Sequence, residues 1–85
     1  MPVISLFYGI IIYMYAKDHP APHFHARYQD EQAIYDLEGN LIEGHMPKRQ
    51  DRLISAWAEI HHDDLVANWD LAERGEQPMK IDPIR

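Results

Sequence analysis

The hydrophobic pattern of this 85-residue chain changes its period at Pro47, and that change constrains the fold more than any other feature. Before Pro47, short runs rich in β-branched and aromatic residues are separated by turn signals, as is typical of strands. After it, apolar residues recur at steps of three and four, as on a helix that packs against an apolar surface. The sequence therefore predicts an α+β fold, an antiparallel four- to five-stranded β-meander covered on one face by a C-terminal helix or kinked helix pair.

Turn signals divide the first 46 residues into strands. Gly9 separates the runs 3–8 and 10–17, which we interpret as a β-hairpin. Further strands are predicted at about 23–28, 32–37 and 41–45, with turns at 29–31 and 38–40. The run that begins at residue 10 is apolar on both faces, which suits a central strand. One of its faces would meet a helix, and the other a ligand, a partner or another copy of the chain.

Residues 47–75 are predicted to be helical, with Pro47 at the first helical position. The polar sequence from His61 to Asp64 interrupts the apolar stripe, so we expect either one kinked helix or two helices meeting near His62. Gly75 is expected to cap the end, and the apolar tail 76–85 is expected to lie extended against the same single domain, 1–85. The predicted stripe consists of Leu53, Ile54, Trp57, Ala58, His61, Leu65, Trp69 and Ala72.

Composition limits the function. The formal net charge of −6 argues against broad electrostatic binding of nucleic acid, which depends on many Lys and Arg side chains. The absence of cysteine excludes disulfides and thiolate metal sites, and it fits a reducing compartment. The apolar run 10–16 is too short to span a bilayer. We therefore expect a cytoplasmic protein with no membrane partner, small enough to gain stability from a homo-oligomer or another partner.

The segment 18–25 concentrates the chemistry, with three histidines, one aspartate and two prolines in eight positions. The prolines favour extended backbone, and strand alternation would then place His23, His25 and Arg27 on one face. Imidazoles at this spacing suit general acid–base catalysis or anion binding near neutral pH. We expect no cofactor; the alternative is a divalent metal held by His23 and His25, with Asp18 or His19 as a third ligand.

Several cations are candidates for binding a phosphate. Arg27 and Lys17 flank the histidines, and a guanidinium beside imidazoles suits phosphate recognition. The alternative for Arg27 is a cross-strand ion pair with Asp36 or Glu31. Three further cations occupy the start of the predicted helix, where the helix dipole disfavours them. They would bind an anion or an acidic partner, or act only as solubilising residues, and they are Lys48, Arg49 and Arg52.

The chain resembles the small bacterial family catalogued as domain of unknown function 4160. The resemblance rests on the opening Met-Pro-Val-Ile, the block 18–25, the helix from Trp57 to Trp69 and the ending 80–84. Ala21 stands where the family usually has a second consecutive proline. The resemblance implies the toxin component of a two-gene toxin–antitoxin module, held inactive by an antitoxin protein. It assigns the activity to Asp18, His19, His23 and His25.

The leading hypothesis is a toxin that acts on a phosphate-bearing target, with RNA as the first candidate. His23 and His25 would exchange protons, Arg27 would hold the phosphate, and Asp18 would orient His19 or His23. Two rival hypotheses remain from the residues alone. One is a protein-binding module without catalysis that uses a sheet edge and the apolar strand face, and the other is a metal-binding domain.

Overall fold

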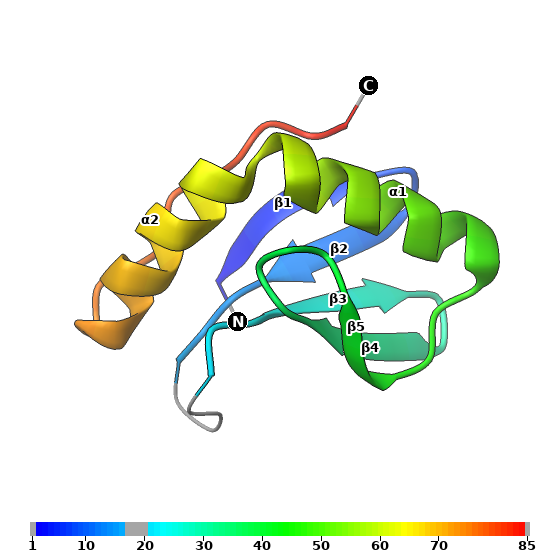
Figure 1. Cartoon of the computed structure of the whole chain (residues 1–85), viewed down its shortest axis with the longest axis horizontal. Helices are drawn as coiled ribbons and strands as arrows, with labels where there is room; N and C mark the ends of the chain where they lie inside the picture. The colour runs from blue at the N-terminus through cyan, green and yellow to red at the C-terminus, as the bar shows by residue number, and fades with distance from the viewer. Residues whose placement is uncertain (1, 17–20, 85) are drawn as a thin grey trace.

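The computed structural model describes residues 2–16 and 21–84 and confirms the α+β prediction. Five antiparallel strands form one sheet whose spatial order, β1-β2-β3-β4-β5, is the order of the sequence. Two helices follow the strands and lie together on one side of the sheet (Figure 1). The elements are β1 Val3–Phe7, β2 Ile10–Tyr13, β3 Phe24–Tyr28, β4 Glu31–Tyr35, β5 Leu41–Gly44, α1 Lys48–Ile60 and α2 His62–Glu73.

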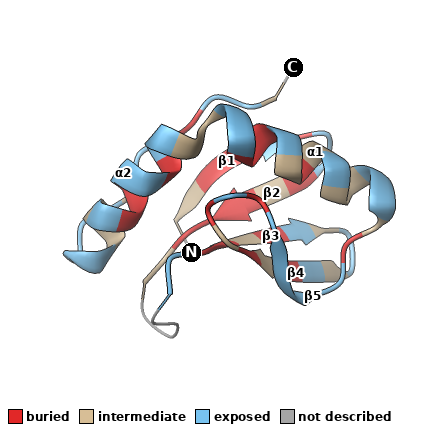
Figure 2. Cartoon of the chain, in the orientation of Figure 1, coloured by how far each residue is buried: buried red, intermediate tan, exposed pale blue. Residues whose placement is uncertain are grey.

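The core lies between the helices and one face of the sheet. Ile12, Ala26 and Ala33 are register partners on three adjacent strands, and all three are buried. The helices bury an inner stripe against this face and leave their outer side exposed (Figure 2). The opposite face of the sheet has no covering element among the described residues, and we call it the open face. The buried residues of the helices are Ile54, Trp57, Ala58, Leu65, Asn68 and Trp69.

The turn between β1 and β2 consists of two residues with positive φ, Tyr8 at 49° and Gly9 at 78°. Positive φ at both positions is the pattern of the tight hairpin turn whose twist matches that of the strands. The expected role of Gly9 is thus confirmed. Tyr8 is unusual, because a bulky residue in the left-handed region is strained. The residue is 58% exposed.

Replacing Tyr8 by asparagine is expected to raise the free energy of unfolding by roughly 1 kcal/mol, since asparagine tolerates the left-handed region and suits this turn. Urea denaturation followed by circular dichroism measures the change. A Tyr8→Ala variant is the control, because it removes the exposed ring but keeps a side chain that disfavours positive φ. Equal stability of the asparagine and alanine variants would contradict the explanation.

The helical region consists of two helices joined at His61, which is the second of the two predicted arrangements. Gly75, at φ 78°, follows Arg74, the C-cap residue of α2, and closes the helix as predicted. The Gly75 amide donates to the Ala72 carbonyl at 3.0 Å, and the Glu76 amide donates to the Leu71 carbonyl at 2.9 Å. These two bonds define a Schellman motif, which satisfies carbonyls that the helix end leaves without partners.

The segment after α2 returns along the helices to β1. The buried Asn68 side chain forms two hydrogen bonds with the backbone of Met79, and the Ile81 amide donates to the Ile4 carbonyl at 2.7 Å. The Trp57 indole N–H donates to the Asp82 carbonyl at 2.8 Å. This segment is therefore bound to α1, α2 and β1, although it forms neither helix nor strand.

Candidate functional site

One row of side chains crosses the open face from β2 to β5. Tyr13 pairs with His25, His25 pairs with Ile34, and Ile34 pairs with Glu43. Partners in antiparallel strands point to the same face, so four consecutive strands each contribute one residue to this row. The row is central to the open face and contains an imidazole, a phenol and a carboxylate.

The His25 ring stacks on two tyrosines of the preceding strand and its extension. Its centroid lies 5.0 Å from that of Tyr13 and 4.7 Å from that of Tyr15, with the rings nearly parallel at 11° and 12°. Tyr13 is buried, and burial, with a further contribution from Tyr15, raises the pKa of its phenol. Arg27 lowers this pKa in part. The stacking defines the orientation of the His25 ring, and burial favours the neutral form of the Tyr13 phenol.

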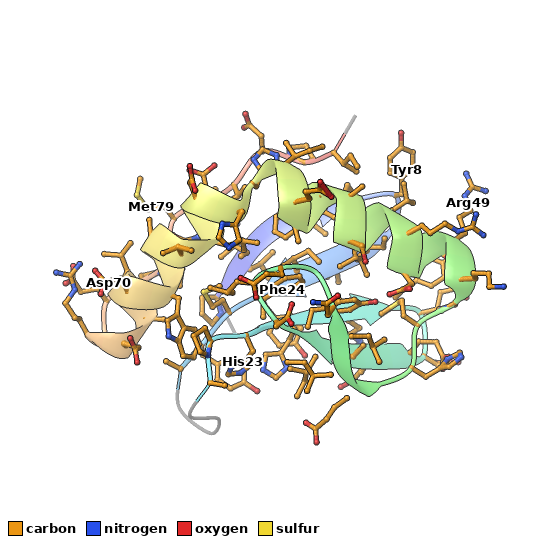
Figure 3. The ribbon with its side chains drawn as sticks, in the orientation of Figure 1. Tyr8, His23, Phe24, Arg49, Asp70 and Met79 are labelled. Carbon is orange, nitrogen blue, oxygen red and sulfur yellow. The ribbon has the colours of Figure 1, made fainter. Side chains whose placement is uncertain are left out.

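His23 contacts this stack from its buried side. Sequence alternation predicted it on the same face as His25. In the structure His23 is 1% exposed, so its ring is not available at the surface. It precedes the first residue of β3, and its ring packs at 5.1 Å from both His25 and Trp69 of α2 (Figure 3). His23 Nδ1 lies 2.9 Å from the Ala21 carbonyl oxygen. A carbonyl only accepts, so Nδ1 carries the proton, and Nε2 is the acceptor of the neutral ring.

Arg27 is exposed on the open face, in the row next to His25. Its register partner on β4 is Gln32, and the two acids proposed as its partners are engaged elsewhere. Glu31 pairs with His45, whereas Asp36 accepts hydrogen bonds from its own turn. Among the residues that the structure describes, the predicted cross-strand ion pair of Arg27 is therefore not formed.

A hollow of about 290 Å³ opens on this face between the aromatic stack and β5. Its lining includes His25, Tyr13 and Tyr15 on one side and Glu43 and Gln32 on the other. A larger hollow of about 680 Å³ lies between the end of β2 and the end of α2. Its side chains are mostly apolar, and Tyr15 is common to both hollows. We place the candidate site at the smaller hollow, because the His25 imidazole lines it and Arg27 belongs to the adjacent row of the same face.

The cations of α1 are not part of this site. Lys48, Arg49 and Arg52 are exposed on the first turns of α1, and α1 covers the face opposite His25. Figure 3 shows Arg49 at one end of the molecule, far from His23. Within the described parts of the chain these three residues form no ion pair. They do not converge with Arg27 on one phosphate.

Three predicted site residues, Lys17, Asp18 and His19, lie outside the described residues. Among residues 2–16 and 21–84, no group of three or more His, Asp or Glu side chains is placed to hold a metal ion. Of the two predicted metal ligands, His23 already uses Nδ1 for the Ala21 carbonyl. The described part of the site therefore contains imidazole, phenol, guanidinium and carboxylate groups suited to proton transfer and anion binding.

Sequence reasoning missed three members of the site. Tyr13 and Tyr15 alternate with the buried Ile12 and Met14, which places them on the face of His25. This alternation is present in the sequence, where the run predicts only a strand that is apolar on both faces. Glu43 gave no comparable signal, because its place beside Ile34 depends on an irregular register between β4 and β5.

The fold and site define a small α+β domain whose sheet is covered by helices on one face and carries a histidine–tyrosine cluster on the open face. The chain belongs to the family described as Domain of unknown function (DUF4160), which it matches over residues 9–70. No curated protein and no solved structure matches the chain. Within the described residues, neither helix has the length and apolar character needed to cross a membrane.

Proposed function

We propose that this chain is a bacterial toxin that inhibits growth by acting on a phosphate-bearing target, with RNA as the first candidate, and that a protein antitoxin neutralises it. The toxin class comes from the family resemblance of the sequence. The chemistry is supported by one observation above all. His25 stands on the open face, fixed between two tyrosines and the ring of His23, with Arg27 two residues further along the same strand.

The buried position of His23 suggests a division of roles. His25 is partly exposed although its Nε2 is buried, and in this proposal its imidazole contacts the target. His23 contacts the His25 ring from the buried side. His23 is therefore a positioning residue in this proposal. Arg27 would hold the phosphate, and it offers a local positive charge on a chain whose formal net charge is −6.

The reaction that this arrangement suits is attack of a ribose 2′-hydroxyl on its neighbouring phosphate. His25 would accept the hydroxyl proton, and the 2′ oxygen would bond to phosphorus. The bond from phosphorus to the 5′ oxygen would break, and that oxygen would take a proton from the His25 imidazolium. The products are a 2′,3′-cyclic phosphate and a 5′-hydroxyl, and His25 returns to its neutral form.

A second candidate is a protein-binding module without catalysis. The observation that favours it is the apolar character of the open face next to the site. Leu6 is 60% exposed and pairs with Ile11, which in turn pairs with Arg27. An apolar face rimmed by polar residues is typical of a protein interface. This candidate predicts that substitution of His25 changes partner affinity and leaves growth and RNA intact.

Induction of the native chain in bacteria is expected to arrest growth, and induction of a His25→Ala variant at equal soluble level is expected to permit it. General acid–base catalysis typically contributes a factor of about 10²–10⁴, so the loss of His25 should abolish arrest within the period of the assay. Optical density and extracted RNA are measured together. Cleaved RNA with cyclic phosphate ends is expected only with the native chain.

The matched control is His62→Ala. His62 is a partly exposed histidine at the start of α2, where it pairs with Glu38 on the surface, remote from the row on the open face. Exposed pairs contribute little stability, so this variant should fold and arrest growth like the native chain. Normal growth on induction of the soluble native chain would refute the toxin proposal. Arrest that persists in His25→Ala would refute the proposed site.

A further inference from the structure

The hollow beside His25 has two unlike walls. Tyr13, Tyr15 and His25 supply aromatic rings on one side, while Glu43 and Gln32 supply polar groups on the other. Ile34 lies between them in the same row. Resting on the proposed action on RNA, we propose that this hollow is a base-recognition pocket selective for guanine, with Glu43 as the residue that determines specificity.

The dimensions of the row suit a single base. His25 on β3 and Glu43 on β5 are separated by one strand, so their backbones lie roughly 10 Å apart at the usual strand spacing. The hollow between them has a volume of about 290 Å³ and is open to solvent on the uncovered face. A planar ring can enter over Ile34, with one edge toward Glu43 and the other toward the aromatic stack.

Aromatic rings at this wall suit a base, since unstacked bases of single-stranded RNA are commonly held against Tyr or His side chains. The stack is well ordered for this purpose. Tyr13 and Tyr15 lie nearly parallel to each other at 17°, and both are nearly parallel to His25. Arg27, in the adjacent row, is placed for the phosphate of the same nucleotide.

The carboxylate at the opposite wall selects among the four bases. An ionised carboxylate only accepts hydrogen bonds, and its two oxygens suit two adjacent donors. Guanine presents such a pair, its ring N1–H and its exocyclic amino group. The pairing edges of adenine and cytosine place a ring nitrogen acceptor next to their amino group, and uracil flanks its single N–H with two carbonyls. Those acceptors would face the carboxylate and be repelled.

Guanosine 3′-monophosphate is the probe, because it has the base and the phosphate but no bond left to cleave. Titration of the full-length ¹⁵N-labelled chain is expected to shift the amide signals of residues around the hollow. The dissociation constant for this nucleotide should be about tenfold lower than for the adenosine, cytidine and uridine 3′-monophosphates, as expected for one charge-assisted hydrogen bond.

In a Glu43→Gln variant, guanosine 3′-monophosphate should bind about tenfold more weakly, because the amide places a donor against the guanine donors. Glu43 is exposed on an edge strand, so the variant is expected to fold. Glu59→Gln is the matched control, since it removes the same charge from an exposed position on α1. Glu59→Gln should leave the dissociation constant for guanosine 3′-monophosphate unchanged.

Equal affinity for the four nucleotides, no binding, or an unchanged constant in Glu43→Gln would overturn the base pocket. These outcomes are separable from those of the growth experiment. Growth arrest without selective binding of the guanosine nucleotide would overturn the pocket and leave the toxin proposal standing. Selective binding that depends on Glu43, without growth arrest, would establish a guanine-binding site and refute the toxin proposal.

Discussion

Replacement of Trp57 by alanine is expected to lower the free energy of unfolding by about 3–5 kcal/mol, the usual cost of deleting a buried aromatic ring. Trp57 is fully buried at the centre of the core. Its ring packs 5.4 Å from Phe7 and 5.6 Å from Phe24, so it joins α1 to two strands. The loss is a large share of the roughly 4–13 kcal/mol expected for a domain of this length.

Trp57→Phe separates packing from hydrogen bonding, because phenylalanine fills much of the space but has no N–H for the Asp82 carbonyl. We expect this variant to lose about 1–2 kcal/mol and the alanine variant to lose clearly more. Ile60→Ala is the control on the same helix, since Ile60 is 67% exposed and should change stability by less than about 0.5 kcal/mol. Urea denaturation followed by circular dichroism measures all three, and equal losses in Trp57→Ala and Ile60→Ala would contradict the proposed core.

Replacement of Gly44 by alanine is expected to lower the free energy of unfolding by about 2–5 kcal/mol, through backbone strain of about 1–2 kcal/mol and overpacking of about 1–3 kcal/mol. Gly44 has a φ of 86°, and a Cβ there would lie 2.3 Å from the Gln32 carbonyl oxygen and 2.9 Å from the Ala33 Cα. Both neighbours are backbone atoms of the adjacent strand, so β5 must move away from β4. The amides of β5 should then lose protection from hydrogen exchange.

Gly75→Ala is the matched control for this experiment. Gly75 has a similar φ of 78°, but nothing lies within 4 Å of the position that a Cβ would occupy. The Gly75→Ala variant should therefore lose only about 1–2 kcal/mol of unfolding free energy, through backbone strain alone. The difference between the two variants, measured by denaturation, isolates the contact between β4 and β5. Equal destabilisation of both variants would show that this close contact is absent in solution.

The fold was predictable because its signals are local. Gly9 and Gly75 stand at positions of positive φ, and the period of the apolar residues changes next to Pro47, immediately before the first helix. The sequence left two arrangements of the helical region open, and the structure shows two helices joined at His61. Trp57 of α1 packs on Phe7 and Phe24, and Trp69 of α2 packs on His23. Residue spacing alone does not determine such tertiary contacts.

The site was less predictable, because its members come from different strands. Strand alternation correctly placed His25 and Arg27 opposite Phe24 and Ala26. It did not predict the burial of His23, which lies just before the strand and packs against Trp69 of α2. Alternation applies only within a strand. The burial of a residue at the end of a strand depends instead on which other element packs against it. The pairing that brings Glu43 into the row likewise follows from a register that the sequence does not reveal.

The row on the open face depends on the register of three strand pairs, β2 with β3, β3 with β4 and β4 with β5. A slip of one residue in any pairing turns that strand's side chains to the other face. The turn between β4 and β5 is fixed by Asp36, whose side chain accepts hydrogen bonds from the amides of Glu38 and Asn40. Asp36 lies outside the row, and it thus helps to align the strands that carry the row. Laboratory evolution of binding on this face is therefore expected to select changes in the turns as well as in the row itself.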